Sequence, residues 1–148
     1  MIRLLAIVGG SLSVAFAVCA WAAPASADTN QYTRTTSGKV RCLVTDNDAG
    51  HGGGPAVACE HSAGFPQAPL GPAGTPDAIA AVHANGAFSW VDGNIGGGGE
   101  PENDLVLRYG QTYHIAGWTV FPTSAGTTFT NDATSHGMFV SVQDVHSF

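Results

Sequence analysis

Basic side chains are scarce in this sequence, and those present do not cluster. The chain of 148 residues has five Lys and Arg against eleven Asp and Glu, and charged residues make up only 11% of it. Nucleic acids and anionic lipid surfaces are bound through clustered Lys and Arg, which neutralise their phosphates. The composition therefore argues against both as partners.

Long apolar runs are also nearly absent. The one such run, 4–20, follows Arg3 and is short for a helix that spans a bilayer. Small residues and proline follow it at 24–27, where a membrane anchor would have Lys or Arg. A positive start, an apolar stretch and a small-residue cleavage motif are the three parts of a secretory signal peptide.

We therefore expect residues 1–27 to be a signal peptide that is cleaved between Ala27 and Asp28. The remaining residues, 28–148, have the length of a single domain and contain no further membrane span. An uncleaved membrane anchor and a lipid-modified Cys19 are the alternatives. The expected location is extracellular or in the cell envelope.

Cysteine is scarce as well. Cys42 and Cys59 remain after the leader is removed, and exported proteins fold under oxidising conditions. We expect these two residues to form a disulfide across, or close to, a pair of strands, with the turn-rich segment 46–54 between them. In the chain-entropy model, a loop of this size contributes about 3 kcal/mol to stability. A free reactive thiol is the alternative.

What the sequence has in abundance is glycine, with 20 residues, and short β-branched or aromatic runs between turn signals. Short strands separated by regular turn signals are typical of sandwiches and small barrels. We expect an all-β, mainly antiparallel domain, a small β-sandwich or barrel-like fold with Gly- and Pro-rich loops. The expected strands are 40–45, 57–60, 79–83, 88–91, 105–107, 111–115, 118–121, 127–130 and 138–142.

The connections carry their own signals. Asn85–Gly86 predicts a hairpin with a type I′ turn, in which both residues have positive φ. A helix over 76–83 is the alternative, because Pro and Asp at 76 and 77 are typical of a helix start. We expect a surface loop at the Pro-rich 65–77, a flexible loop at 94–104, and a loose leader or edge strand at 28–34.

No pattern in the chain identifies a catalytic centre, and we expect no catalytic residues. A G-x-S-x-G nucleophile elbow is missing. The segment 46–48 resembles the start of a calcium loop, but His51 stands where that loop needs glycine. The acidic residues Glu100, Glu102 and Asp104 suggest a glycosidase pair, yet a Gly-rich loop does not by itself fix their separation.

Histidine and aromatic residues leave two binding alternatives open. Imidazole is a common metal ligand, yet no two histidines have a compact zinc spacing, and we expect no metal or cofactor. The aromatic residues suit a sugar-binding platform or a core equally well. The histidines are His51, His61, His83, His114, His136 and His146, and the aromatic residues are Phe88, Trp90, Tyr113, Trp118 and Phe121.

Short motifs at both ends of 28–148 occur in the order found in a known family. TSGKVRC at 36–42, with Ser37 and Gly38, and VACE at 57–60 resemble an SPSGNIxC…VxCE opening. LRYG, GTTFTN and TSHGMF resemble LxYG, GVTCxN and TGHGF, and they contain Tyr109, Gly110, His136 and Gly137. In these motifs the chain resembles small exported actinobacterial proteins of the mycobacterial type, whose domain has no assigned function.

The resemblance implies a secreted or envelope-associated protein and implies no activity. It also implies that later cysteines of the family are replaced here by Trp90, by a residue near Val120 and by Phe129, so that one disulfide remains. His136 lies within a motif, and we expect its ring to hold the turn before the last strand through a hydrogen bond.

Taken together, the sequence predicts a non-catalytic, monomeric, exported binding module with an unidentified envelope or extracellular partner. The alternatives are a cell-wall-directed hydrolase, which would use the acidic loop or His136, and an extracytoplasmic metal-binding protein.

Overall fold

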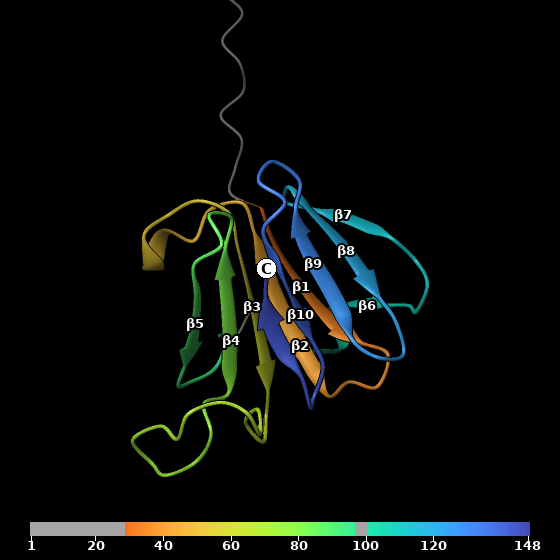
Figure 1. Cartoon of the computed structure of the whole chain (residues 1–148). Coiled ribbons are helices and arrows are strands. Elements are labelled where there is room, and N and C mark those ends of the chain that lie inside the picture. The colour runs from red at the N-terminus through yellow and green to blue at the C-terminus, as the bar shows by residue number, and fades with distance from the viewer. Residues whose placement is uncertain (1–28, 97–100) are drawn as a thin grey trace, which may run out of the picture.

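The computed structural model describes residues 29–96 and 101–148. They form a β-sandwich of two sheets, antiparallel except for one strand pair, which confirms the expected all-β architecture (Figure 1). The predicted signal peptide, its cleavage site between Ala27 and Asp28, and Cys19 lie outside the described residues.

The chain completes one sheet before it begins the other. The six-stranded sheet has the order β5-β4-β3-β2-β1-β6, and the five-stranded sheet has the order β11-β10-β9-β8-β7. The first contains β1 (Asn30–Thr35), β2 (Val40–Thr45), β3 (Ala56–His61), β4 (Ile79–His83), β5 (Phe88–Val91) and β6 (Leu105–Leu107). The second contains β7 (Tyr113–Ile115), β8 (Trp118–Pro122), β9 (Thr127–Asn131), β10 (Gly137–Val140) and β11 (Val145–Ser147).

The core lies between the two sheets, because alternate residues of each strand point to the same side. Trp118, Val120, Phe129 and Met138 of the five-stranded sheet are fully buried against the valines and Leu107 of the six-stranded sheet. The core is filled by side chains from both sheets. Of the expected aromatic residues, Trp118 is buried in this core, Phe88, Trp90 and Tyr113 pack against it, and Phe121 is exposed.

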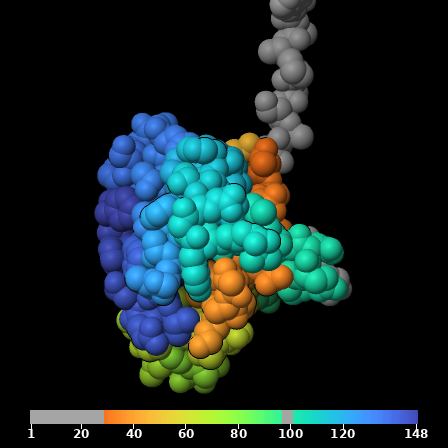
Figure 2. Space-filling view, turned by 90° about the vertical axis from the view of Figure 1, so that its right-hand side faces the viewer, coloured from red at the N-terminus to blue at the C-terminus, as the bar shows by residue number. Residues whose placement is uncertain are grey.

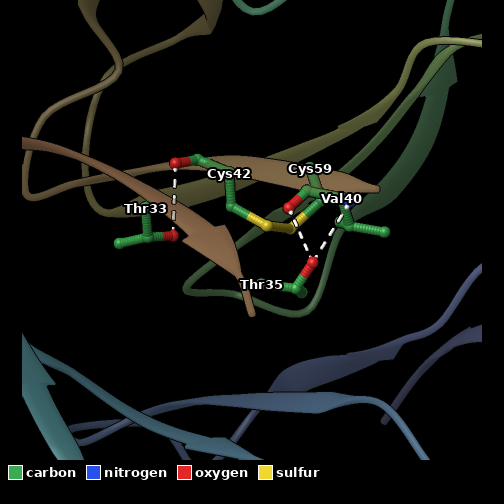
Figure 3. Close-up of a disulfide and its surroundings, with 5 residues drawn as sticks. All are labelled: Thr33, Thr35, Val40, Cys42 and Cys59. Carbon is green, nitrogen blue, oxygen red and sulfur yellow. Dashed lines mark hydrogen bonds between the residues drawn. A yellow bond between two sulfur atoms is a disulfide. The ribbon is translucent and has the colours of Figure 1, made fainter. Parts of the chain in front are cut away.

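The expected disulfide joins directly opposed residues of β2 and β3. Cys42 and Cys59 are paired in register with their Cα atoms 4.0 Å apart, and both are buried on the core side of the sheet. Figure 3 shows the bond on the face turned toward the other sheet, with two threonines of β1 beside it. The buried Thr33 and the half-buried Thr35 donate their hydroxyl protons to the carbonyl oxygens of Cys42 and Val40.

Several local expectations are wrong in detail. The expected edge strand at 28–34 is β1, which lies inside the sheet between β2 and β6. The Asn85–Gly86 turn is a three-residue loop rather than type I′: the Gly86 N–H donates to the His83 carbonyl, and only Gly86 has positive φ. The expected surface loop at 65–77 sends Phe65 into the core, where its ring packs on Trp90. Strand 138–142 ends at Val140, and the three-residue β11 was not expected.

The connection between β5 and β6 determines the outer surface of the six-stranded sheet. These two strands lie at opposite edges of the sheet. Of the connection between them, which we call the crossing connection, Ile95 and Gly96 lie on the face turned away from the five-stranded sheet, the outer face, because they bond to Glu60 and Arg41 there. In the edge-on view of Figure 2, teal residues after 101 stand out beyond the orange strands on that side.

Within residues 29–96 and 101–148, no helical segment has the length and apolar character that crossing a membrane requires.

Replacing both disulfide cysteines with alanine tests the contribution of this bond. We expect the Cys42→Ala/Cys59→Ala variant to lose about 2–4 kcal/mol of unfolding free energy, because the bridge no longer restrains the unfolded chain. Urea unfolding followed by tryptophan fluorescence measures this. Wild-type protein unfolded and refolded in reductant is the control and should match the variant. An unchanged midpoint would show that the bond is not needed for stability.

Candidate functional site

Strand register arranges the outer face of the six-stranded sheet in three rows that run across the strands. The lower row is Arg34, Arg41, Glu60, Ile79 and Val91, the middle row is Tyr32, Leu43, Ala58, Ala81 and Ser89, and the upper row is Asn30, Thr45, Ala56 and His83. Alanines therefore occupy the middle of the face on two neighbouring central strands. Their short side chains leave space that neighbouring segments do not fill.

The crossing connection covers the lower row. The Ile95 N–H donates to a Glu60 carboxylate oxygen at 3.3 Å, and Arg41 donates to the Gly96 carbonyl at 3.3 Å. The Tyr32 hydroxyl donates to the Ile95 carbonyl at 3.4 Å. Ile95 and Ile79 are buried although neither belongs to the core between the sheets. The connection thus forms a small apolar layer of its own on the outer face, and 94–96 is anchored where a flexible loop was expected.

An ion pair fixes the end of this connection. Arg41 donates two hydrogen bonds to Asp104, from Nε at 2.6 Å and from Nη2 at 3.0 Å, and its guanidinium lies 4.6 Å from the centre of the Tyr32 ring. The Asp104 side chain is only 3% exposed. Such bidentate pairs combine charge with a fixed geometry. Asp104 is therefore a structural anchor rather than a free carboxylate.

The same pair affects the titration of Arg41. The hydrogen bond to Asp104 raises the pKa of Arg41 above its ordinary value, and the nearby negative charges of Asp104 and Glu60 raise it further. Burial acts in the opposite direction and offsets part of this rise. When folding raises the pKa of an arginine, the stability gained by the folded protein is fully present below the ordinary pKa of arginine. It is lost only as the pH rises through the pKa of that arginine in the folded protein. Arg41 therefore stays charged at every physiological pH.

The upper border of the face is formed by the loop between β2 and β3, which includes the 3-10 turn Ala49–His51. Asp46 accepts a hydrogen bond from the Thr29 N–H, and Asn47 accepts one from the Gly54 N–H. The Asp48 carboxylate lies 2.9 Å from Nδ1 of His51. The residues that resembled a calcium loop therefore stabilise a turn, and they place Asp48 and His51 beside the alanine floor.

Between the crossing connection and this loop lies a cavity of about 390 Å³, which we call the outer hollow. Its floor and walls are apolar, from Leu43, Ala56, Ala58, Ala81, Val91 and Ile95, and its rim is polar, from Asp48, His51, His83, Ser89, Asp92 and Asn94. A second hollow of about 550 Å³ adjoins it and shares His51, His83 and Ser89. An apolar cavity with a few polar groups at its rim, within the size range of small-ligand sites, is the usual form of a binding pocket.

Serine, histidine and aspartate meet at this rim without forming a catalytic triad. His51 is oriented by Asp48, as the base of a triad would be. Among residues 29–96 and 101–148, however, no hydrogen bond joins the Ser89 hydroxyl to His51 or His83.

The residues singled out from the family-like motifs hold turns and strands outside the lining of the outer hollow, although VACE also contains Ala58 of its floor. Ser37 and Tyr109 line a small cavity of about 160 Å³ at another position. Gly38 and Gly110 have φ of 72° and 77°, which favours glycine, and Gly137 has no room for a side chain against the Phe129 carbonyl. The sequence motifs therefore did not identify the outer hollow. The signal in the sequence that could have identified it is the placement of alanines at outward-facing positions of the strands.

His136 does not hold the turn in the expected way. Its ring lies against Gly86 of the β4–β5 loop, and Nδ1 is 3.3 Å from the carbonyl oxygen of Phe148. The nearby Thr134 hydroxyl donates to the Ala84 carbonyl. His136 thus lies where the β4–β5 loop of one sheet meets the last strand of the other.

The other histidines and acidic residues are dispersed over the molecule. His61 bonds the Gly64 carbonyl, His114 the Thr119 hydroxyl, and His146 pairs with Asp144. In the described part of the chain, no group of three His, Cys, Asp or Glu side chains has an arrangement that would hold a metal ion. Glu102 is exposed in the turn Pro101–Asn103, and Glu100 lies outside the described residues.

Comparison with known proteins gives no match to this chain among protein-family models, curated proteins or solved structures. The candidate site therefore stands on its geometry.

Removing the guanidinium tests whether the ion pair holds the wall of the outer hollow. We expect Arg41→Ala to lower the unfolding free energy by roughly 1–3 kcal/mol, because the Asp104 carboxylate is left buried without its donor. Thermal and urea unfolding measure the loss. Arg34→Ala, on the neighbouring strand of the same face, is the matched control and should change stability by less than about 0.5 kcal/mol. Equal losses in both variants would contradict the anchoring role.

Proposed function

We propose that this protein is an exported, non-catalytic binding module and that the outer hollow is its binding site. The observation that carries the proposal is the apolar cavity of about 390 Å³ built on the alanine floor. The core between the two sheets is formed by buried side chains from both of them. The outer hollow lies on the opposite face of the six-stranded sheet.

The positions of the candidate catalytic groups support binding over hydrolysis. Asp104 is bonded to Arg41, and His136 lies against Gly86, so neither converges with other acid or base groups. General acid–base pairs need a fixed mutual geometry around a substrate.

Export to the extracellular space or cell envelope is the second part of the proposal. It is supported by the leader-like sequence of 1–27 and by the buried disulfide, a bond that persists in oxidising compartments. The motif resemblance to exported actinobacterial proteins points the same way. The positions that the resemblance assigns to lost cysteines include Val120 and Phe129, which are directly paired on β8 and β9 as Cys42 and Cys59 are on β2 and β3.

Intact-mass measurement of protein produced in an actinobacterial host tests export. We expect material recovered from the medium or envelope to begin at Asp28 and to be lighter than the reduced chain by two hydrogens, because the leader is cleaved and the cysteines are bridged. Alkylation without prior reduction serves as the control for free thiols. A cytoplasmic product that retains 1–27 would overturn the proposed localisation.

Filling the outer hollow tests the binding function. Ala81→Leu places a larger side chain on the floor, so we expect molecules that copurify with the wild type, and are released on denaturation, to be absent from the variant. Mass spectrometry of the released fraction makes the comparison. Ala58→Leu should behave as Ala81→Leu does, and Thr128→Leu, on the outer face of the five-stranded sheet, is the matched control. The same released species from wild type and Ala81→Leu would show that the hollow is not the site.

A further inference from the structure

The full charges among the residues that line the outer hollow are negative. Two carboxylates line it, Asp48 from the β2–β3 loop and Asp92 from the residue after β5. No Lys or Arg is among the lining residues of this hollow or of the one that adjoins it. The cationic groups that can arise at the rim are the imidazoles of His51 and His83, and His51 lies against Asp48 at 2.9 Å.

The nearest arginine is not available to an anionic ligand. Arg41 lies on the same face, but its guanidinium is bonded to Asp104 and to the Gly96 carbonyl beneath the crossing connection. Its charge is therefore compensated within the protein. Glu60, in the same covered row, accepts a hydrogen bond from the Ile95 N–H, and its negative charge raises the pKa of Arg41.

The floor of the hollow requires a different property of the ligand. Leu43, Ala58 and Ala81 come from three adjacent strands and offer no hydrogen-bonding side chain. Burying a polar group there without a partner would cost free energy, whereas an apolar group gains by leaving water. A ligand that fits both features has an apolar body for the floor and a positive group for the rim.

We propose that the outer hollow binds a small amphipathic cation, an apolar chain or ring that bears an ammonium group. The apolar body lies on the alanine floor, and the ammonium group lies at the rim, in the negative field of Asp48 and Asp92. This ligand class rests on the proposed binding function of the same hollow.

Three probes with the same apolar chain and different head groups test the ligand class. We expect octylamine to bind the mature, disulfide-bonded protein more tightly than octanol, and octanol more tightly than octanoate, in calorimetric titrations at neutral pH and low salt. Replacing a carboxylate by its amide removes charge with little change of shape. We expect Asp48→Asn/Asp92→Asn to weaken octylamine roughly two- to fivefold per carboxylate and to leave octanol unchanged.

Controls separate the ligand class from the site. Asp144→Asn, next to β11 on the other sheet, should keep the wild-type order of the three probes, and Asp92→Asn alone tests the rim if the double variant does not fold. Octanoate binding as tightly as octylamine would overturn the cationic ligand while leaving the hollow as a binding site. Failure of all three probes, or equal binding to Ala81→Leu, would instead overturn the hollow itself.

Discussion

The anchoring of the β5–β6 connection by Arg41 is the interaction on which the arrangement of the outer face depends. Strand order places β5 and β6 at opposite edges of one sheet, so the chain has to cross a face that would otherwise be open to solvent. Arg41 bonds that connection at the Asp104 carboxylate and the Gly96 carbonyl, and its guanidinium lies over the Tyr32 ring of β1. Without them the hollow would lose the wall that turns a flat sheet into a cavity.

The six-stranded sheet has one face packed in the core and an outer face that carries the candidate site. On the core side, close-packed side chains and the Cys42–Cys59 bond restrict movement of the strands. Substitutions that change side-chain volume are poorly tolerated in interiors packed in this way. On the outer side of the same strands, the residues between those core positions are Leu43 and Ala58, whose side chains only partly cover the backbone. One pair of strands thus supplies both the covalent link and the floor of the candidate site.

Local sequence signals predicted the strands because alternation and turn residues act over a few positions. They located 40–45 within its observed bounds, the hairpin around Gly86, and the opposition of Cys42 and Cys59. They did not predict that β1 is internal, because its parallel partner β6 is about seventy residues away and reaches it only through the crossing. The hollow was missed for the same reason: its lining comes from four strands and two connections, and no short motif spans them.

The parallel pairing of β1 with β6 also has a consequence for the order in which the sheet assembles. Strands β1 to β5 follow one another as antiparallel neighbours, so each contact forms between segments close in the chain. Strand β6 can pair with β1 only after the long chain segment between them has folded back on the sheet. Contacts between residues so far apart in the sequence form slowly. The six-stranded sheet is therefore expected to grow as a five-stranded meander whose remaining edge is sealed last, and the ligand-sized space comes into being only with that final step.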